Sequence, residues 1–314
     1  MQKALVTGGA GFIGSHLAAA LVERGVEVTV LDNLSTGKLE NMAGFRDRVR
    51  FVEGSITDAD TLRDCCAGVD VVFHEAALAS VPRSVDDPFN SNLHNIDGTL
   101  QVLIAARDAG VKRLVYAASS SAYGDSASLP KREDMPSAPM SPYAVQKYVG
   151  ELYLKVFADL YGLSSVGLRY FNVFGPRQDP ASQYAAVVPI FITKVLAGEA
   201  PTINGDGSYS RDFTYIDNVV HANMCAAEAP DPGGVTVNAA CGDRFTLNEL
   251  YEAIQDCAGC RVDPVYGPAR VGDVPHSQAD ISLAREVIGY EPQVDFTTGL
   301  SRTVAWYQEQ AARV

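Results

Sequence analysis

The sequence predicts an α/β protein built on a doubly wound parallel sheet, with a second, smaller α/β region packed on it. Three observations predict this fold. Short β-branched apolar segments alternate with amphipathic helical segments in the first half, a glycine-rich turn joins the first such segment to the first helix, and the alternation loosens after about residue 170. Strand–helix–strand units of this length favour parallel strands with helices on both faces of the sheet.

The first half supplies the strands and helices of the predicted sheet. Its first apolar segment ends at Thr7-Gly8-Gly9, and the helix that follows ends at Gly25. Glycine marks such boundaries because it adopts backbone conformations that end regular structure. We expect strands at 4–6, 26–31, 69–73 and 113–117, and helices at 12–24 and 93–109.

Loop signals are more frequent in the second half, where segments such as Asn204-Gly205-Asp206-Gly207 interrupt the helices. We expect one region over residues 1–170 and a second over 171–314, with a segment at about 215–240 returning to the first. The length of 314 residues agrees with one large or two modest domains. The helices that we expect here lie at 185–196, 218–227, 247–257, 281–288 and 298–311.

The charge balance excludes some classes of partner. Lysine and arginine total 25 against 38 aspartate and glutamate residues, which gives a formal net charge of −13. Such a surface repels the phosphate backbone of nucleic acids and anionic lipid head groups. We therefore expect neither nucleic-acid binding nor membrane binding, and an anionic ligand would need arginines concentrated at its site.

The chain has six cysteines and no apolar run near the ~18 residues that a membrane span needs. Its N-terminal apolar stretch is too short for a signal peptide, so we expect a cytoplasmic protein whose cysteines are thiols. Cys257 and Cys260 form a single C-x-x-C motif without a second pair or a nearby histidine. Half a ligand set does not make a metal site, so we expect no metal and a helix that ends at Gly259.

The first strand and helix enclose a candidate cofactor site. Gly8, Gly11 and Gly14 are spaced three apart between them, so the turn can be tight, a pyrophosphate can approach the backbone, and the helix can pack on the strand. The N-terminus of the helix then holds the phosphates. Asp32 ends the next expected strand, where a carboxylate accepts hydrogen bonds from a ribose and repels a 2′-phosphate. The pattern predicts NAD rather than NADP.

A candidate catalytic pair lies on a later helix. Ser141 is a good N-cap and Pro142 suits the first helical position, so Tyr143 and Lys147 share one helix face at i and i+4. An ammonium beside a phenol favours the phenolate and lowers its pKa, so we expect Tyr143 to act as a base. Ser119, Ser120 and Ser121 follow an expected strand, at the edge of a parallel sheet where ligands bind.

Longer segments resemble a known family over nearly the whole chain. They are TGGAGFIGSHL, LDNLSTG, FHEAALASVPRS, NIDGTL, SSSAYGD, SPYAVQK, LRYFNVFGPRQDP, NGDGSYSRDFTYIDNV and GDVPHSQAD. With them the sequence resembles the extended short-chain dehydrogenases/reductases and, within these, the UDP-hexose 4-epimerases. ALASVPRS and HSQAD are most similar to the branch that handles N-acetylated UDP-hexosamines. The resemblance implies a Rossmann-like NAD-binding domain over 1–170, a UDP-sugar-binding region over 171–314, and a homodimer formed through two long helices, roughly 90–109 and 142–160.

The resemblance also implies roles for individual residues. The base and its lysine fall on Tyr143 and Lys147, and the catalytic hydroxyl falls on Ser119. NAD contacts are implied for Gly8, Gly11, Phe12, Ile13, Gly14, Asp32, Asn33, Gly37, Ile56, Ala76, Asn95, Tyr143 and Lys147. Contacts with the UDP-sugar are implied for Ala79, Ser80, Ser119, Ser121, Tyr143, Asn172, Ala186, Arg211, Arg270, Asp273 and Ser277.

Four positions qualify this assignment. Ser55 stands where these enzymes often have an aspartate for the adenine. Ala79 stands where the glucose and galactose enzymes often have a lysine, which favours the hexosamine branch. An arginine fork suits pyrophosphate geometry, but Arg83 and Arg177 fit an exposed surface charge equally well.

The resemblance implies reversible C4 epimerisation of a UDP-hexose, UDP-GlcNAc/UDP-GalNAc together with UDP-Glc/UDP-Gal, through a 4-keto sugar and tightly bound NAD. Three alternatives remain. A 4,6-dehydratase needs an acid and a base where this chain has Ser120 and Ser121. A UDP-glucuronate epimerase or decarboxylase is the second. An NAD-sensing binding protein is the third, although a sensor has no need of the base Tyr143.

Overall fold

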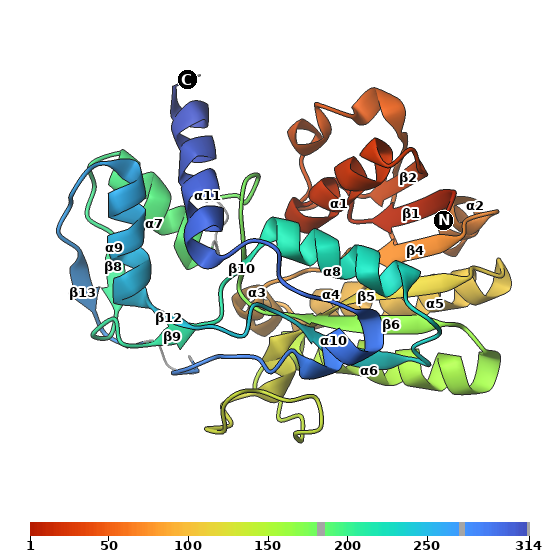
Figure 1. The fold of residues 1–314 in the computed structure, drawn as a ribbon. Helices are drawn as coiled ribbons and strands as arrows, with labels where there is room; N and C mark the ends of the chain where they lie inside the picture. Colours follow the sequence, from red (N-terminus) through yellow and green to blue (C-terminus); the bar gives the residue numbers. More distant parts are fainter. Residues whose placement is uncertain (181–185, 270–273, 313–314) are drawn as a thin grey trace.

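The computed structural model describes residues 1–180, 186–269 and 274–312 of the chain. The described residues form a central parallel sheet of seven strands in the order β11-β6-β5-β4-β1-β2-β3 (Figure 1). The chain first builds the sheet from β1 toward β3 and then returns to the other side of β1, so the order reverses between β1 and β4. The strands are β1 (Lys3–Thr7), β2 (Glu27–Asp32), β3 (Arg50–Glu53), β4 (Val71–His74), β5 (Arg113–Ser119), β6 (Ser165–Tyr170) and β11 (Val235–Ala239).

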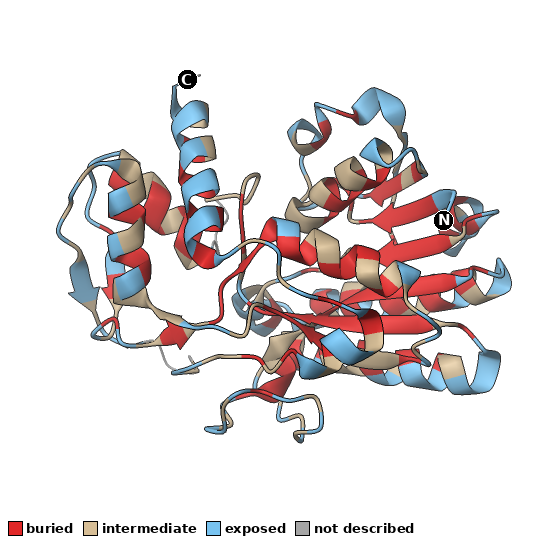
Figure 2. Ribbon diagram, in the orientation of Figure 1, coloured by how far each residue is buried: buried red, intermediate tan, exposed pale blue. Residues whose placement is uncertain are grey.

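Helices cover both faces of this sheet (Figure 1). On one face α1 packs on β1 and β2, α8 packs on β5 and β6, and α10 packs on β11; α2, α5 and α6 cover the other face. Because both faces are covered, the five inner strands β6, β5, β4, β1 and β2 are almost wholly buried, whereas the edge strand β3 has exposed ends (Figure 2). The helices are α1 (Phe12–Glu23), α2 (Ala59–Cys66), α5 (Thr99–Asp108), α6 (Pro142–Tyr161), α8 (Ile216–Glu228) and α10 (Ser282–Ile288). The prediction of a doubly wound parallel sheet is confirmed.

α6 carries the candidate catalytic pair, and local sequence fixes its position. The N-cap Ser141 accepts a hydrogen bond from the Ala144 N–H at 3.2 Å, and Pro142 occupies the first helical position. The helix approaches β5 closely because Gly150 has no side chain; a Cβ there would lie 2.3 Å from the Tyr116 hydroxyl oxygen. This close approach brings the first turns of α6 to the end of β5.

A smaller region lies beside the sheet and forms the lobe around α7, α9 and α11 in Figure 1. Its helices pack on one another, and three short strand pairs connect them to the rest of the chain. Its helices are α7 (Val187–Leu196), α9 (Leu247–Ala258) and α11 (Phe296–Ala311). Its strand pairs are β7 (Val173–Phe174) with β10 (Thr214–Tyr215), β8 (Thr202–Asn204) with β13 (Val265–Gly267), and β9 (Ser210–Arg211) with β12 (Phe245–Thr246).

Short helical turns connect the larger elements. α3 (Val81–Asp86), α4 (Pro88–Asn92) and a π-helical turn over Leu93–Gly98 lead into α5, so the expected helix over 93–109 is interrupted near its start. Three 3₁₀ turns complete the set, at Leu39–Met42, Arg46–Arg48 and Ser120–Tyr123.

Four expected strands correspond to β1, β2, β4 and β5, with ends that differ by at most two residues. β3, β6 and β11 are not expected from the sequence, because their short apolar runs include charged residues, glycine or asparagine. α8 and β11 belong to the layers of the central sheet, and α10 covers β11. The division of the chain at residue 170 stays a prediction.

None of the described helices is both long and apolar enough to cross a membrane. Likewise, no group of three or more His, Cys, Asp or Glu side chains in the described segments could hold a metal ion. α9 ends at Ala258, and Gly259 adopts a left-handed conformation with φ 69°. Cys257 and Cys260 are both free thiols.

Candidate active site

A cavity of about 750 Å³ opens at the carboxyl ends of the strands, beside the point where the strand order reverses. This volume suits a cofactor or a small-molecule ligand. Its wall includes the glycine-rich turn after β1, the loop after β2, and residues at the ends of β4, β5 and β6. In open α/β sheets ligands bind at this place, so the cavity is the candidate active site.

The turn after β1 forms a cradle in which side chains do not fit. Gly8 has φ +71°, and a Cβ there would lie 2.8 Å from the backbone of Ala76. A Cβ on Gly14 would lie 2.2 Å from the Gly8 carbonyl oxygen, which explains the close packing of α1 on β1. Gly11 is the N-cap of α1 and has no side chain. The free N–H groups at the N-terminus of the helix therefore lie in the cavity wall. This cradle fits the pyrophosphate of a dinucleotide.

Asp32 is held in one orientation at the end of β2. Its two carboxylate oxygens accept hydrogen bonds from the Ala10 N–H at 2.9 Å and the Leu34 N–H at 2.8 Å. Burial raises the pKa of the carboxyl, and these two bonds oppose the rise. Gly37 lies against it, since a Cβ there would be 2.7 Å from a carboxylate oxygen. Each oxygen keeps a lone pair for a ribose hydroxyl, as the sequence predicts for NAD.

Most of the expected cofactor residues line the cavity together. Asn95 is the exception among them, because its side chain is 1% exposed and lies behind the wall. Its amide accepts a hydrogen bond from the Leu78 N–H at 2.8 Å and donates one to the Gln146 side chain at 2.9 Å. Asn95 therefore positions the loop after β4 and does not reach into the cavity. The expected residues that do line it are Gly8, Gly11, Phe12, Ile13, Gly14, Asp32, Asn33, Gly37, Ile56, Ala76, Tyr143 and Lys147.

Tyr143 and Lys147 line the cavity from α6. The Lys147 ammonium donates to the Ala117 carbonyl oxygen at 2.7 Å and lies over the Tyr116 ring. Burial lowers the pKa of Lys147 to about 8, and the carboxylates of Glu75 and Glu151 oppose this fall.

One expectation about this pair is wrong. We expect Lys147 to lower the pKa of Tyr143, but burial raises the pKa of Tyr143, and the contact that opposes this rise comes from the Ser119 hydroxyl. The physical reason is that the phenol is shielded from water while the ammonium is directed to the carbonyl of Ala117.

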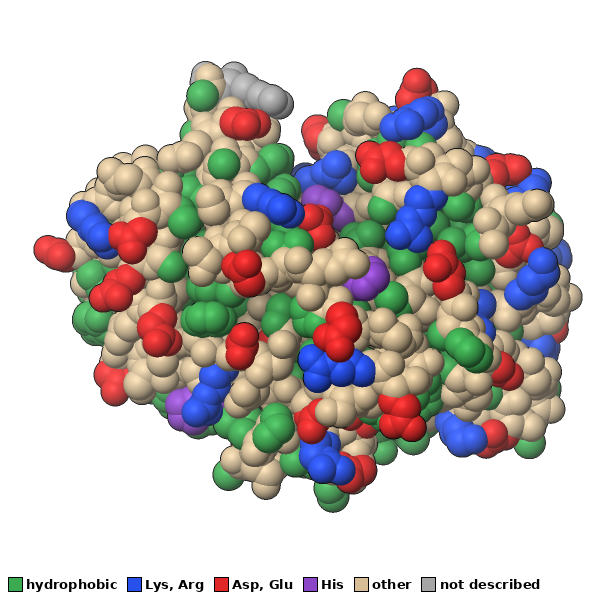
Figure 3. Space-filling model, viewed as in Figure 1, with side chains coloured by type: hydrophobic (Ala, Val, Ile, Leu, Met, Phe, Trp, Pro, Cys, Tyr) green, Lys and Arg blue, Asp and Glu red, His purple; other side chains and the backbone are tan. Residues whose placement is uncertain are grey.

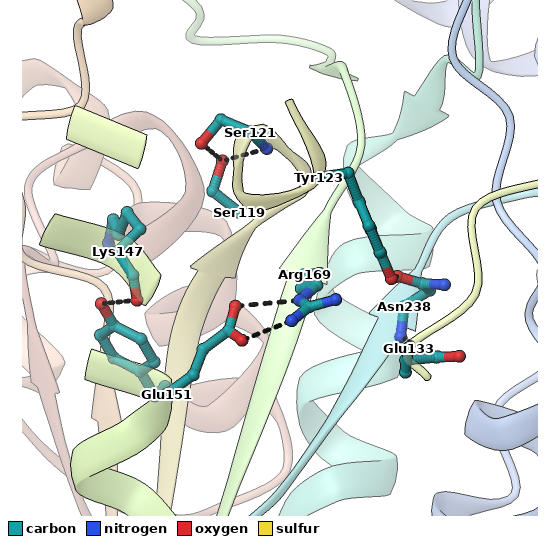
Figure 4. Close-up of polar contacts among 9 residues, drawn as sticks. Ser119, Ser121, Tyr123, Glu133, Lys147, Glu151, Arg169 and Asn238 are labelled. Carbon is teal, nitrogen blue, oxygen red and sulfur yellow. Dashed lines mark hydrogen bonds and ion pairs between the residues drawn. The ribbon is translucent and has the colours of Figure 1, made fainter. Parts of the chain in front are cut away.

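Ser119 and Ser121 form a hydroxyl pair at the end of β5 (Figure 4). Their Oγ atoms are 2.9 Å apart, and the Ser121 N–H donates to Ser119 Oγ at 3.2 Å. Ser119 thereby caps the 3₁₀ turn at Ser120–Tyr123, which fixes its side chain. A fixed hydroxyl beside Tyr143 can hydrogen-bond a substrate oxygen there.

A buried ion pair supports α6 behind Lys147 (Figure 4). Glu151 lies one turn after Lys147, and its carboxylate pairs with the Arg169 guanidinium at 3.0 and 2.7 Å; both side chains are 5% exposed. Arg169 lies on β6 and stacks on the Tyr123 ring at 4.5 Å. The pair therefore joins α6 to the sheet beneath the candidate catalytic residues.

Glu75 and Tyr170 also line the cavity, and neither is among the site residues expected from the sequence. The Tyr170 hydroxyl donates to Glu75 Oε1 at 2.8 Å and accepts from Asn223 Nδ2 at 2.8 Å. Burial raises the pKa of Glu75 to about 7. The sequence carries a signal for Glu75, because Glu75 lies two residues after an expected strand, as Ser119 does.

The expected sugar residues fall into separate places. Ala79 and Ala186 line the cavity. Arg211 and Ser277 come together beside β9, where the Ser277 N–H donates to the Ser210 carbonyl oxygen at 3.0 Å and Arg211 donates to the Ser210 carbonyl oxygen at 3.0 Å. In the described segments these two do not line the cavity with Tyr143.

Two other sugar candidates have local roles, and two cannot be placed. The Ser80 hydroxyl caps α3 by accepting from the Arg83 N–H at 3.2 Å. Asn172 has φ +30° and donates to the Asp212 carbonyl oxygen at 3.1 Å. Arg270 and Asp273 lie outside the described residues.

A dinucleotide cradle joined to a Tyr–Lys pair at the reversal of a doubly wound sheet is typical of the short-chain dehydrogenases/reductases. More narrowly, the chain belongs to the NAD dependent epimerase/dehydratase family, whose family model matches residues 4–240. NAD is therefore the cofactor for which this cavity is built.

Similar proteins cover the chain from end to end. It is 42% identical to a UDP-glucose 4-epimerase of Mycolicibacterium smegmatis, over 99% of this chain and 100% of the relative. Among solved structures, a UDP-glucose 4-epimerase from Thermotoga maritima with UDP-glucose is 41% identical with a TM-score of 0.94, over 99% and 100% of the two chains. A UDP-N-acetylglucosamine 4-epimerase from Methanobrevibacter ruminantium in complex with UDP-N-acetylmuramic acid is 44% identical with a TM-score of 0.94, over 98% and 99%.

Proposed function

We propose that the protein interconverts UDP-hexoses at C4, with UDP-GlcNAc and UDP-GalNAc as substrates together with UDP-Glc and UDP-Gal. The observation that carries this proposal is that Tyr143 and Lys147 lie together in the wall of the dinucleotide cavity and that the Ser119 hydroxyl hydrogen-bonds Tyr143. The similar proteins named above are UDP-glucose and UDP-N-acetylglucosamine 4-epimerases, which supports the reaction and leaves the choice of sugar to experiment. A UDP-N-acetyl-alpha-D-glucosaminuronate decarboxylase and a dTDP-glucose 4,6-dehydratase are less similar, at 31% and 33% identity.

Each residue of the chain has a distinct task in this proposal. Tyr143 takes the proton from the sugar O4. Ser119, whose hydroxyl hydrogen-bonds Tyr143, also hydrogen-bonds the sugar O4. The Lys147 ammonium donates to the Ala117 carbonyl oxygen and supplies a positive charge to the cavity wall. When bound, NAD supplies the acceptor and donor of the C4 hydride. Tyr143 returns its proton after the 4-keto sugar has turned over in the pocket.

Small residues favour the acetylated sugars. Ala79 and Ala186 line the cavity, and Ser277 lies beside β9 with Arg211. A sugar that turns over with a 2-acetamido group sweeps a larger volume than a plain hexose, so small side chains around it are a steric requirement. Arg211 is the candidate for the UDP phosphates, which an arginine fork recognises geometrically.

The same site disfavours a dehydratase. Elimination needs an acid and a base next to the catalytic hydroxyl, and Ser120 and Ser121 follow Ser119. The Ser121 hydroxyl is bonded to Ser119, and a serine hydroxyl cannot serve as an acid or base at neutral pH.

We also infer that the protein is a homodimer through the face that α6 shares with α3, α4 and the π-helical turn. Phe89 and Leu160 are 82% and 70% exposed, and apolar side chains continue in stripes along both segments. Contiguous apolar surface of this kind marks an interface with another chain. The exposed apolar residues are Val81, Val85, Phe89 and Leu93, and on α6 Val145, Leu152, Val156 and Leu160. Val156→Asp should give a monomer by size-exclusion chromatography with light scattering.

Incubation with UDP-GlcNAc and no added reductant tests the proposed reaction. NMR should show UDP-GalNAc accumulating to equilibrium, with no net change in NADH absorbance, and UDP-Glc should give UDP-Gal. A 4-keto-6-deoxy product would instead establish a dehydratase. Release of CO₂ from UDP-glucuronate would establish a decarboxylase, and no conversion of any UDP-sugar would leave a binding protein.

A further inference from the structure

A short strap from the smaller region crosses to the sheet region and closes one side of the cofactor cavity. We define the strap as Pro176, Arg177, Gln178 and Asp179, of which the last three line the cavity. It follows β7 and lies between α1 and α11 (Figure 1), where the molecular surface is hollowed and carries basic and histidine side chains (Figure 3).

The strap is tied down on both of its sides. His16 on α1 donates from Nε2 to the Pro176 carbonyl oxygen at 2.9 Å, and the Tyr307 hydroxyl on α11 donates to the Gln178 carbonyl oxygen. The Lys38 ammonium, in the loop after β2, pairs with the Asp179 carboxylate at 2.8 Å. Lys38 lines the cavity too, so this ion pair joins two parts of the cavity wall that come from different regions.

Arg177 places a positive charge at the first turn of α1. Its Nη1 lies 3.4 Å from Ser15 Oγ. Within the described part of the chain Arg177 forms no ion pair at contact distance; burial lowers the pKa of Arg177, and the Glu23 carboxylate opposes this fall from farther away. His16 beside it stays neutral, because burial and Arg177 lower the pKa of His16 to about 4. A partly buried cation that no carboxylate contacts is costly, so an anion is expected next to it.

Two further features indicate that the strap is shaped for a ligand. Arg177 has φ +65°, a left-handed conformation that is strained for a residue with a side chain. Gln178 donates from Nε2 to the Val173 carbonyl oxygen at 3.1 Å, whereas its Oε1 is buried without a hydrogen-bond partner in the described part of the chain. Strain and an unused buried acceptor are retained where a functional contact compensates for them.

We propose that the strap retains the bound dinucleotide: Arg177 binds its pyrophosphate opposite the Gly11 cradle, and the Lys38–Asp179 ion pair holds the strap closed over it. This inference rests on the NAD dependence of the family and not on the sugar specificity proposed above. The cradle supplies backbone N–H groups from the sheet region, and the strap adds one cation from the smaller region. The cofactor then leaves only when the two regions separate locally.

The first experiment tests Arg177. Protein stripped of NAD is titrated with NAD and with ADP-ribose, which shares the pyrophosphate, by calorimetry. Loss of a hydrogen bond between charged groups should weaken both ligands by about 10- to 100-fold in Arg177→Met, with Arg177→Lys in between. Arg24→Met is the matched control, because Arg24 pairs with Glu228 at the other end of α1. Unchanged affinity in Arg177→Met, or an equal loss in Arg24→Met, would overturn the assignment.

The second experiment tests the Lys38–Asp179 ion pair with the variant Lys38→Met. Lys38 is exposed, so this change does not disturb the core. Bound NADH is chased with excess NAD, and its release is followed by fluorescence. Lys38→Met should speed release by about two- to fivefold in low salt, the range for an exposed ion pair. Wild type should approach the variant's rate in ~1 M salt, where screening removes the pair's contribution. Equal rates in low salt would overturn the closing role.

The affinity for NAD and the rate of NADH release are both measured without a sugar. The proposed role of the strap and the proposed epimerase reaction can therefore fail independently of each other. A protein that retains NAD through the strap and does not convert UDP-hexoses would refute the proposed function alone. A protein that epimerises UDP-GlcNAc and whose Arg177→Met variant binds NAD normally would refute the strap alone.

Discussion

The sheet region and the smaller region build their parts of the site in different ways. In the sheet region the candidate residues lie at strand ends: Asp32 is the last residue of β2, and Ser119 is the last residue of β5. In the smaller region Arg211 meets Ser277 only because the segments around Ser210 and His276, 66 residues apart, pair side by side. A site at strand ends is encoded locally, whereas a site between loops depends on how distant segments pack.

Two buried carboxylates, one in each region, stabilise their surroundings through different partners. Glu151 is paired with a cation, Arg169, and this pair fixes one helix on one strand. Asp212 instead accepts three backbone hydrogen bonds, from the N–H groups of Cys241, Gly242 and Ala279 at 3.0–3.1 Å. Burial raises the pKa of Asp212 to about 7. In the sheet region an ion pair between side chains thus fixes α6 on β6. In the smaller region backbone hydrogen bonds to one carboxylate fix the loops.

The largest expected effect is the loss of the base from the sheet region. Tyr143→Phe keeps the ring and removes the ionisable oxygen, so turnover should fall by about 10²- to 10⁴-fold, the usual contribution of general base catalysis. UDP binding should survive, because it is assigned to the other region. Turnover and UDP affinity are measured together, with Tyr148→Phe on the same helix as control. Near-wild-type turnover in Tyr143→Phe would remove Tyr143 from the mechanism.

The second prediction concerns the support of α6. Glu151→Met leaves Arg169 buried without its partner, so the free energy of unfolding should fall by about 3–5 kcal/mol. The double variant Glu151→Met/Arg169→Met should recover most of this loss, because no unpaired charge remains. Urea unfolding measures both. The exposed pair Lys155–Asp159 on the same helix is the control, and Lys155→Met should cost about 0.5 kcal/mol or less. A double variant as unstable as the single one would contradict this account.

The same difference between regions explains what the sequence could predict. The glycine spacing, Asp32 and the Tyr–Lys pair are readable because turn, strand and helix signals place them. Glu75 was readable by the same rule and was missed. The hydrogen bonds of Asn95 cannot be read from the sequence, because nothing local shows that its amide turns inward to Leu78; its contact with NAD stays a prediction. The strap could not be predicted, because the sequence does not distinguish Arg177 from an exposed surface arginine. Only the fold shows that Arg177 lies beside α1.

The third prediction tests the smaller region. Ser277→Tyr adds bulk beside Arg211, where overfilling costs ~1–3 kcal/mol, or ~5- to 150-fold in rate. Turnover of UDP-GlcNAc and UDP-GalNAc should fall by this factor, while turnover of UDP-Glc and UDP-Gal should not change. Ser282→Tyr, at an exposed position of α10, is the control. Equal losses on acetylated and plain sugars, or no loss on either, would place Ser277 away from the sugar.

The smallest expected effect is a change in the pH dependence of turnover. It tests whether the charge of Glu75 acts on the pKa of Lys147 in the sheet region. Burial lowers the pKa of Lys147 to about 8, and the carboxylates of Glu75 and Glu151 oppose that fall. Burial raises the pKa of Glu75 to about 7, so Glu75 is ionised in the range where Lys147 titrates. The ammonium is the form that is lost as pH rises through its pKa. Turnover of the wild type should therefore decline above about pH 8.

Glu75→Gln removes the carboxylate and keeps an acceptor for the Tyr170 hydroxyl, which donates to Glu75 at 2.8 Å. The pKa of Lys147 should then fall further, so the alkaline decline in turnover should begin at lower pH. Since one pKa unit corresponds to about 1.4 kcal/mol, turnover at pH 8 should drop by at most about tenfold, with little change near pH 6. The pH–rate profile measures this, and Glu53→Gln, at the exposed end of β3, should leave the profile unchanged. If Glu75→Gln lowered turnover equally at every pH, its role would be packing around Tyr170, and its charge would not act on Lys147.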